Sequence, residues 1–152
     1  MGSTLSPVEV LARLPQQAPF RFIDAILEID AEHVVASQRF RPEADFYRGH
    51  FPGNPITPGV LLVEAMAQAG VVALGIFLMA LEGEDAEAQK MATLFTDINV
   101  EFSGVVRPGE QVMITGKKIF FRRRKLRSQV EMRVEDGRVV CSGTLSGMGV
   151  IR

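Results

Sequence analysis

The longest hydrophobic stretch of the chain runs from Val60 to Leu81 and contains a single charged side chain, Glu64. Its length is that of a helix. Pro58 stands where the first helical residue is expected, and Thr57 is the predicted N-cap. A helix that is apolar on all sides has to be buried on all sides, so other elements must surround it. The sequence therefore predicts one long central helix that carries a carboxyl group into the core.

Most other hydrophobic positions form shorter runs rich in branched and aromatic residues, which is typical of strands. Turn residues separate these runs, and Asp136-Gly137 predicts a type I′ hairpin. A capping box from Ser6 to Glu9 predicts a short helix that ends near Arg13. The predicted strands are 20–29, 33–41, 91–102, 111–121, 126–135 and 138–148.

Two strands, one long helix and a meander of long strands thus follow one another along the chain. An antiparallel sheet curled around one apolar helix satisfies this order, so the predicted class is α+β. The chain has 152 residues, enough for one core and too few for two, and residues 1–152 are expected to form a single domain. The acidic stretch 82–89 is interpreted as a solvated connection.

Composition and charge narrow the classes of function. The formal net charge is −1, which argues against bulk binding of nucleic acid. Cys141 is the only cysteine, so no intrachain disulfide is expected. The N-terminal residues lack the pattern of a secretory signal. Glu64 and Gln68 interrupt the apolar run, so we prefer a buried helix to a membrane span and expect a cytoplasmic protein.

Candidate chemistry gathers around the start of the long helix. The loop 42–57 is rich in Pro and Gly and carries His50, a residue type whose ordinary pKa lies near physiological pH. Glu64 follows inside the apolar helix, where burial raises the pKa of a carboxyl group unless it finds a partner. Gln68 lies one turn further on the same face, where it either orients Glu64 or serves helix packing. Without further context, such a histidine and glutamate are more often structural than catalytic.

Three segments at the loop and the helix start form one nearly continuous motif: Gly49-His50-Phe51-Pro52-Gly53-Asn54-Pro55-Ile56, Pro58-Gly59-Val60-Leu61 and Glu64-Ala65-Met66-Ala67-Gln68. This motif resembles the signature of FabZ-type 3-hydroxyacyl-acyl-carrier-protein dehydratases. The resemblance implies that His50 and Glu64 are the catalytic pair. The related FabA branch has an aspartate at the second position, so the glutamate favours the FabZ branch.

The resemblance also implies a hotdog fold and a homodimer, with further assembly into trimers of dimers in many members. In such a dimer, His50 of one chain faces Glu64 of the other. A second family motif precedes the first predicted strand, and here its matches are Leu14, Pro15, Pro19, Phe20 and Asp24. The departures are Gln16 and Gln17, where the family usually has His-Arg, and Arg21, where it usually has an apolar residue. Because this segment helps to shape the acyl site in the family, the departures bear on which acyl chain is preferred.

The reaction that the resemblance implies is the dehydration of (3R)-3-hydroxyacyl thioesters on acyl carrier protein to trans-2-enoyl thioesters, in the synthesis of fatty acids or related acyl chains. His50 suits removal of the C2 proton, and Glu64 suits protonation of the C3 hydroxyl. The amides of Gly59 and Val60 at the helix start are expected to hold the thioester oxygen. Neither a metal nor an organic cofactor is expected.

Aromatic residues complete the expected substrate site. Phe51 and Gln68 are expected beside the acyl thioester. The family has a mobile aromatic gate after the helix, often a Tyr-Phe pair, and the corresponding residues here are Leu94-Phe95. Phe95 is therefore the residue expected to close the tunnel.

The strongest positive feature of the chain is the tract that contains Arg122, Arg123 and Arg124. It is either a solvated hairpin tip or an electrostatic docking site for acidic acyl carrier protein. Nucleic acid is a weaker interpretation, because no aromatic stacking motif accompanies these residues. Two other functions stay open at this point: a hotdog thioesterase, which would hydrolyse acyl thioesters with an acidic residue and water, and a non-catalytic partner subunit that binds acyl carrier protein.

Overall fold

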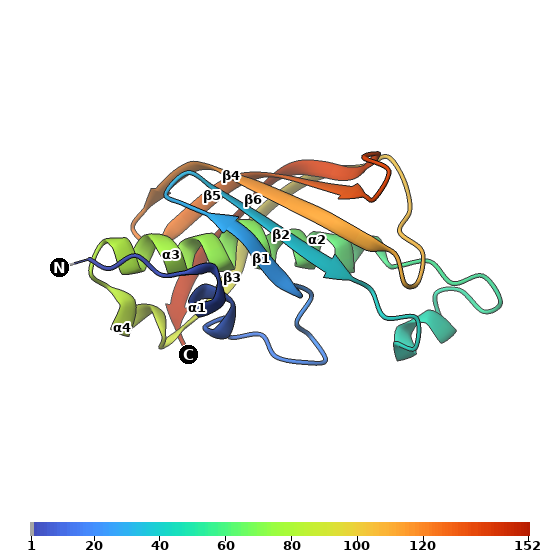
Figure 1. Cartoon of the computed structure of the whole chain (residues 1–152), viewed down its shortest axis with the longest axis horizontal. Coiled ribbons are helices and arrows are strands. Elements are labelled where there is room, and N and C mark those ends of the chain that lie inside the picture. The colour runs from blue at the N-terminus through green and yellow to red at the C-terminus, as the bar shows by residue number, and fades with distance from the viewer. Residues whose placement is uncertain (1) are drawn as a thin grey trace.

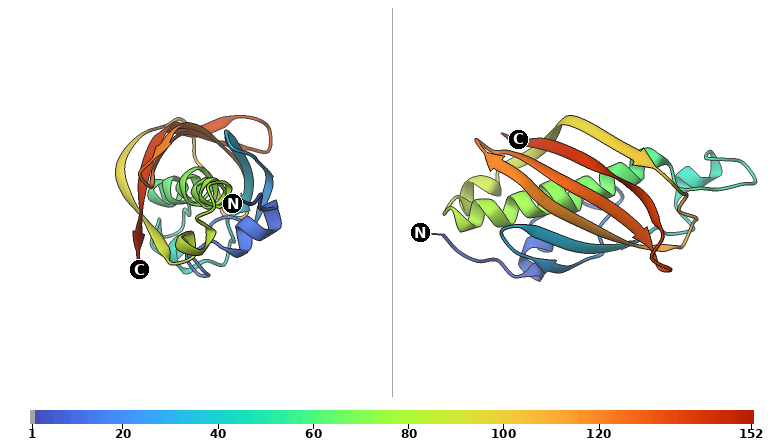
Figure 2. Two further views of the ribbon diagram at one scale, coloured as in Figure 1. Left: turned by 90° about the vertical axis from the view of Figure 1, so that its left-hand side faces the viewer. Right: turned by 90° about the horizontal axis from the view of Figure 1, so that it is seen from above.

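The computed structural model describes residues 2–152, which form a six-stranded antiparallel sheet around a central helix (Figure 1). The end-on view in Figure 2 shows the sheet arching over the helix. The N-terminal segment with helix α1 (Pro7–Ala12) lies on the side that the sheet leaves open. The predicted α+β architecture is thereby confirmed.

The other helical elements are η1 (Asp45–Arg48), α2 (Gly59–Ala67), η2 (Gln68–Ala73), α3 (Leu74–Leu81) and α4 (Asp85–Ala88). The strands are β1 (Ala25–Ile29), β2 (His33–Arg39), β3 (Met91–Phe102), β4 (Gln111–Arg122), β5 (Lys125–Val134) and β6 (Val139–Ile151). They pair in the order β1-β2-β4-β5-β6-β3. The capping box predicted at Ser6 and Glu9 opens helix α1.

Residues 59–81 form one continuous helical run under the sheet. An 18-residue window of this run has a mean hydropathy of 2.0, so length and composition alone would allow it to cross a membrane. However, 78% of that window is buried inside the protein, and Leu62, Met66 and Leu74 are almost completely covered. The run is the buried core helix that the hydrophobic pattern predicts.

The middle of this run, η2, is a π-helix, which the sequence does not predict. Here the helix and the sheet approach each other closely, at Gly70 and Gly116. A Cβ atom on Gly70 would lie 2.6 Å from a methyl carbon of Val130, and a Cβ atom on Gly116 would lie 2.8 Å from the Gly70 Cα atom. The buried Ser128 hydroxyl donates a hydrogen bond of 2.6 Å to the Gly70 carbonyl. Glycine at both positions is therefore what allows the helix and the sheet to approach this closely.

Two local predictions at the start of β1 and α2 are wrong. The strand predicted over 20–29 begins only at Ala25, because backbone groups of Phe20 and Phe22 bond to a helix side chain instead of to a neighbouring strand. Thr57 is not the N-cap of α2, which is Pro58. The Thr57 hydroxyl is instead buried against the hydroxyl of Tyr47, at 2.6 Å.

The turns of the meander also differ from the predicted types. Only Gly137 has a positive φ at the β5–β6 hairpin, and its amide donates to the Val134 carbonyl at 2.9 Å. This is a type I turn followed by a left-handed glycine, not a type I′ turn. The two-residue turn with positive φ at both positions lies at the β4–β5 hairpin, where Arg123 has φ 51° and Arg124 has φ 64°.

The acidic stretch 82–89 is more than a solvated connection. It contains helix α4, where Asp85 forms an ion pair with Arg13 of the N-terminal segment. Glu84 and Glu87 lie 4.0 and 3.9 Å from the guanidinium group of Arg124. The acidic stretch therefore links the end of the central helix both to the N-terminal segment and to the β4–β5 hairpin.

Strand β3 is an edge of the sheet and pairs only with β6. It carries several exposed large hydrophobic side chains, among them Phe95 (45% exposed), Ile98 (48%) and Phe102 (52%). A long edge strand with exposed apolar side chains is a favourable surface for pairing with another chain. This edge lies along the helix that carries Glu64, so the position of β3 bears directly on the site.

Candidate functional site

Glu64 lies on α2, half-buried at the boundary between the core and solvent. Burial raises the pKa of its carboxyl group above the ordinary value, and a hydrogen bond from Gln68 partly opposes this shift. Glu64 lines a small cavity whose other walls are mainly apolar. A carboxyl group held in this way retains its proton to higher pH than an exposed glutamate does, which suits a general acid.

Gln68, at the start of η2, is completely buried and makes three hydrogen bonds. Its Nε2 donates to a Glu64 carboxyl oxygen at 2.9 Å and to the Phe20 carbonyl at 2.8 Å, while its Oε1 accepts from the Phe22 amide at 2.8 Å. The contact with Glu64 is the one that the spacing of the two residues predicts. The two bonds to the segment before β1 are not visible in the sequence, because they join positions more than 40 residues apart.

His50 lies in the loop between η1 and α2, next to a cis peptide bond to Phe51. Its Nδ1 is 3.0 Å from the Ile56 carbonyl oxygen, and the Ile56 amide donates to the His50 carbonyl at 3.0 Å. Because a carbonyl oxygen only accepts hydrogen bonds, Nδ1 carries the proton of the neutral ring. This tautomer leaves the Nε2 lone pair free to act as a base.

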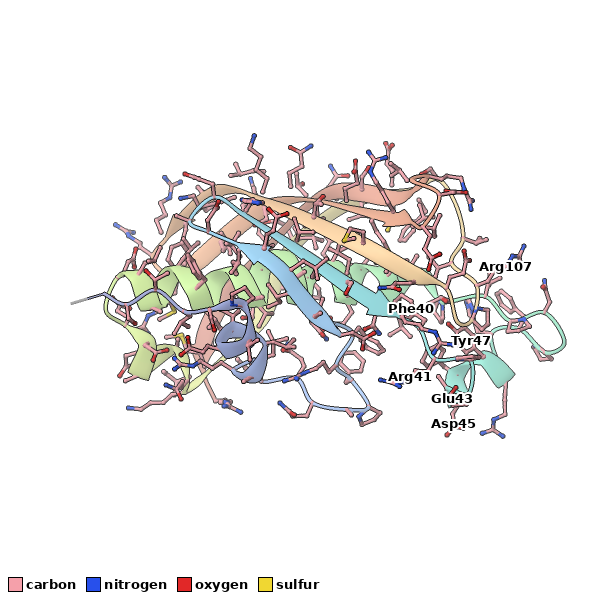
Figure 3. All side chains as sticks on the ribbon, viewed as in Figure 1. Phe40, Arg41, Glu43, Asp45, Tyr47 and Arg107 are labelled. Carbon is pink, nitrogen blue, oxygen red and sulfur yellow. The ribbon has the colours of Figure 1, made fainter. Side chains whose placement is uncertain are left out.

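A buried hydroxyl pair anchors this loop. Tyr47 on η1 bonds to Thr57 at 2.6 Å, and the Thr57 amide donates to the Val106 carbonyl at 2.8 Å. Figure 3 shows Tyr47 at the end of the molecule where the loop projects beyond the sheet. Burial raises the pKa of the Tyr47 hydroxyl, so this side chain serves as a neutral anchor. The pair fixes both ends of the segment that carries His50.

The first two residues of α2 provide free backbone donors. Within residues 2–152, the amides of Gly59 and Val60 have no hydrogen-bond partner, as expected for a first helical turn. Val60 is 76% exposed. The ring of Phe102, on β3, borders Gly59, since a Cβ atom on this glycine would lie 3.1 Å from a ring carbon. The two amides are therefore accessible next to an exposed aromatic surface.

The cavity at Glu64 is also lined by Phe95, the predicted gate residue, and by Gln16 and Ala67. It shares three wall residues, Val71, Val72 and Thr93, with a second cavity that continues along the helix. The deeper walls of this second cavity are mainly apolar and include Ile76, Met79, Met91, Phe121 and Leu126. The two cavities therefore border the same stretch of the central helix.

The structure brings together only part of the predicted site within one chain. Glu64 and Phe95 line the cavity and Gln68 bonds to Glu64, whereas His50 contacts Ile56 and stacks on Phe51 at a ring distance of 4.1 Å. His50 does not line the cavity of Glu64. Its loop projects beyond the end of the sheet (Figure 1), and Phe51 is 48% exposed. A single chain thus presents the two halves of an acid–base pair separately.

The basic tract forms the tip of the β4–β5 hairpin. Arg122 stacks over the ring of Phe120 at 4.9 Å, and Arg124 is drawn toward the acidic side chains of α4. Arg122 and Arg123 are exposed and have no acidic partner within residues 2–152. Of the three arginines at the tip, Arg122 and Arg123 are therefore the ones that remain free for a partner.

Some residues of the site were not identified from the sequence. Gln16, which lines the Glu64 cavity, stood out only as a departure from the family motif. No local sequence pattern predicts two further contacts, because both depend on tertiary packing. These are the contact of Phe102 with Gly59 and the hydrogen bond between Tyr47 and Thr57. Within residues 2–152, no three His, Cys, Asp or Glu side chains gather in a way that would hold a metal ion.

An antiparallel sheet wrapped around one long helix, with a polar loop at the helix start, defines the hotdog fold. Solved structures with this arrangement include a thioesterase from Haemophilus influenzae (16% identical, TM-score 0.67, covering 98% of this chain and 93% of that one). The dehydratase heterocomplex ApeI:P from Xenorhabdus doucetiae is similar as well (17% identical, TM-score 0.69, covering 97% and 93%). At these identities the likeness concerns the fold alone.

The sequence relationship is more specific. The FabA-like domain matches residues 14–145, and the chain belongs to this family. The 3-hydroxyacyl-acyl-carrier-protein dehydratases FabZ of Streptococcus pyogenes serotypes M3 and M1 are each 36% identical to it over 140 residues. These alignments cover 91% of this chain and 94% of each relative. The predicted resemblance is confirmed.

The raised pKa of Glu64 leads to a prediction about stability. Its folded-state pKa lies above the unfolded value, so the fold is disfavoured as Glu64 ionises, and stability is lost as pH rises through the folded pKa. Glu64→Gln removes this ionisation and keeps a polar partner for Gln68. We expect the variant to be more stable than the wild type at pH about 8, with the difference vanishing below pH about 4.

Urea unfolding of both proteins across this pH range tests the prediction, with Glu43→Gln as the control because Glu43 is exposed. A gain in stability that is the same at every pH would contradict it.

Proposed function

We propose that this protein is a dehydratase that converts (3R)-3-hydroxyacyl thioesters carried by acyl carrier protein into trans-2-enoyl thioesters. The main support for the proposal is that the protein offers both a proton donor and a proton acceptor. The donor is the Glu64 carboxyl group, whose pKa is raised and which lies at an apolar cavity, and the acceptor is the free Nε2 of His50. Acid and base of this kind are what elimination of water requires. The names of the 36% identical relatives give the same reaction.

In the proposed mechanism, Nε2 of His50 removes a proton from C2 of the substrate. The electron pair of that C–H bond forms the C2=C3 double bond, and the C3–O bond breaks. Glu64 donates its proton to the departing hydroxyl group, which leaves as water. The amides of Gly59 and Val60 stabilise negative charge on the thioester oxygen while the C2 proton leaves. Gln68 holds the Glu64 carboxyl group in position.

The apolar residues behind Glu64 support an acyl substrate. We place a fatty acyl chain from Glu64, between Val71 and Thr93, toward the cavity near Met79. The helix between Glu64 and Met79 is about 22 Å long at 1.5 Å per residue, and the two small cavities would widen along it to admit an extended chain. Phe51 and Phe95 are assigned to covering the thioester and the entrance. The process would be fatty acid synthesis or the synthesis of related acyl chains.

We infer that the working unit is a homodimer. Two β3 strands would pair edge to edge, bury Ile98 and Phe102, and bring the loop of one chain to the helix of the other. His50 of one chain would then meet Glu64 of its partner and complete two equivalent sites. Further assembly into trimers of dimers and a cytoplasmic location belong to the same proposal.

Arg122 and Arg123 are assigned to docking of acyl carrier protein. They are exposed, are not paired with a carboxylate within residues 2–152, and project at a hairpin tip. Positive charge at such a tip would attract an acidic carrier and increase its association rate. Arg124 contributes less to this surface, because Glu84 and Glu87 partly neutralise it.

Loss of either member of the proposed pair is expected to abolish turnover. We expect His50→Ala and Glu64→Gln each to lower kcat by about 10² to 10⁴-fold, the usual contribution of one positioned acid or base. The assay follows ultraviolet absorbance as a short 3-hydroxyacyl thioester becomes a conjugated enoyl thioester. Circular dichroism and unfolding curves confirm that each variant is folded.

A parallel assay for free thiol separates the alternatives, because a thioesterase releases thiol and a dehydratase does not. Binding of acyl carrier protein without any turnover would instead favour a non-catalytic partner subunit. Wild-type dehydration that survives both substitutions would overturn the assignment of His50 and Glu64.

Mixing the two inactive variants tests whether the site is shared between chains. A mixed dimer of His50→Ala and Glu64→Gln has one site in which both residues are intact. With random exchange half of the dimers are mixed, so we expect about a quarter of wild-type activity after co-refolding. If both residues came from the same chain, the mixture would stay as inactive as its components.

The carrier-docking surface is tested by Arg122→Gln with Arg123→Asn, since asparagine tolerates the positive φ of that position. We expect KM for the carrier-bound substrate to rise about tenfold at low salt, and less at high salt, because the interaction is electrostatic. KM for a short pantetheine thioester should not change. Arg138→Gln, at the β5–β6 hairpin, is the control. An equal effect on both substrates would exclude a docking role.

A further inference from the structure

Gln16 lines the same cavity as Glu64, and its Oε1 atom is buried without a hydrogen-bond partner within residues 2–152. Leaving a buried acceptor unpaired is costly, typically about 1–3 kcal/mol. Proteins keep such a group where a ligand, a water molecule or a function supplies the partner. The rest of the cavity wall consists of Ala67, Val71, Val72, Thr93 and Phe95, so polar partners are scarce there.

The position of Gln16 is fixed by its own segment. The Nε atom of Arg21 donates to the Gln16 carbonyl at 3.0 Å, and its Nη2 donates to the Leu14 carbonyl at 3.3 Å. The side chain of Gln17 also donates to the Leu14 carbonyl, at 3.0 Å. The three departures from the family motif thus act together, because Arg21 and Gln17 hold the turn that directs Gln16 into the cavity.

The same segment is fixed to Glu64 from the other side. Gln68 bonds both to the Glu64 carboxyl group and to the backbone of Phe20 and Phe22. Gln16 and Glu64 therefore border a single cavity, and the segment that follows Gln16 is bonded to the helix that carries Glu64. A substrate group bound between them would meet a proton donor on one side and a proton acceptor on the other.

We propose that Gln16 is a substrate-binding catalytic residue whose Oε1 accepts the hydrogen bond of the substrate's C3 hydroxyl group. This inference rests on the proposed dehydration. The hydroxyl oxygen has to accept a proton from Glu64, so its own O–H must point elsewhere, to an acceptor. When the C3–O bond breaks, this hydrogen and the proton from Glu64 leave together as water.

The contact also favours the transition state. The O–H bond becomes more acidic as the oxygen receives the Glu64 proton and C3–O lengthens, so its hydrogen bond to Gln16 strengthens during the reaction. An interaction that is stronger in the transition state than in the bound substrate raises kcat. It also distinguishes 3-hydroxyacyl thioesters from saturated ones, which have no hydroxyl group to pair with the buried oxygen.

Gln16→Leu removes the acceptor at nearly constant size and is the central variant. We expect kcat for a short 3-hydroxyacyl thioester to fall about 10- to 100-fold, with a smaller change in KM. Gln16→His, which restores a ring nitrogen as acceptor and the residue usual in the family, should recover much of the loss. Gln38→Leu is the control, because the Oε1 of Gln38 is also buried without a hydrogen-bond partner within residues 2–152, but Gln38 does not line this cavity. This control should keep kcat within about threefold of the wild type.

Binding separates a failure of this inference from a failure of the proposed function. The Glu64→Gln variant binds substrate without turnover. Its affinity for a 3-hydroxyacyl thioester and for a saturated acyl thioester is measured, and the same two affinities are measured for the Glu64→Gln variant that also carries Gln16→Leu. We expect preference for the hydroxyl compound to disappear only when Gln16 is replaced. An unchanged preference, or equal weakening for both ligands, overturns the role of Gln16 whether or not the wild type dehydrates its substrate.

Discussion

The hydrogen bonds of Gln68 are the interaction on which the arrangement of the site depends. One buried amide group joins the central helix to the segment before β1 and at the same time holds the Glu64 carboxyl group. A fully buried amide is stable only when its donors and acceptor are paired, and here both sides of the amide are. The position of Glu64 and the late start of β1 therefore follow from one set of contacts.

A second constraint is the close approach of the helix to the sheet. At Gly70 and Gly116 the two backbones are too close for side chains, and the Ser128 hydroxyl bonds to a helix carbonyl there. The helix is a π-helix through this region, a deviation that is frequent near functional sites. Gly70 lies two residues beyond Gln68, so the segment that binds the sheet and the segment that positions Glu64 are the same. Two turns of one helix therefore both pack against the sheet and position the Glu64 carboxyl group.

The sequence predicts the elements of this fold well where periodicity decides them. The apolar run 60–81 identifies the core helix, and a run rich in branched and aromatic residues identifies β3 with its observed bounds. Contacts between distant residues are not encoded in a local pattern. For this reason the sequence predicts Thr57 as a cap, although tertiary packing pairs it with Tyr47, and it extends the first strand back to residue 20, although Gln68 bonds the backbone of Phe20 and Phe22. His50 and Glu64 were found through a motif, whereas nothing in the sequence indicates the buried oxygen of Gln16.

The fold alone does not decide between hydrolysis and dehydration, since solved structures of a thioesterase and of a dehydratase complex resemble this chain about equally. The environment of the carboxyl group does bear on the choice. Hydrolysis needs a water molecule beside an ionised carboxylate that acts as its base. Here burial raises the pKa of Glu64, and Ala67, Val71 and Phe95 surround it with apolar surface. Such a site disfavours both the ionised form and a bound nucleophilic water. It favours a carboxylic acid that gives its proton to a leaving hydroxyl group, which is the step that elimination needs.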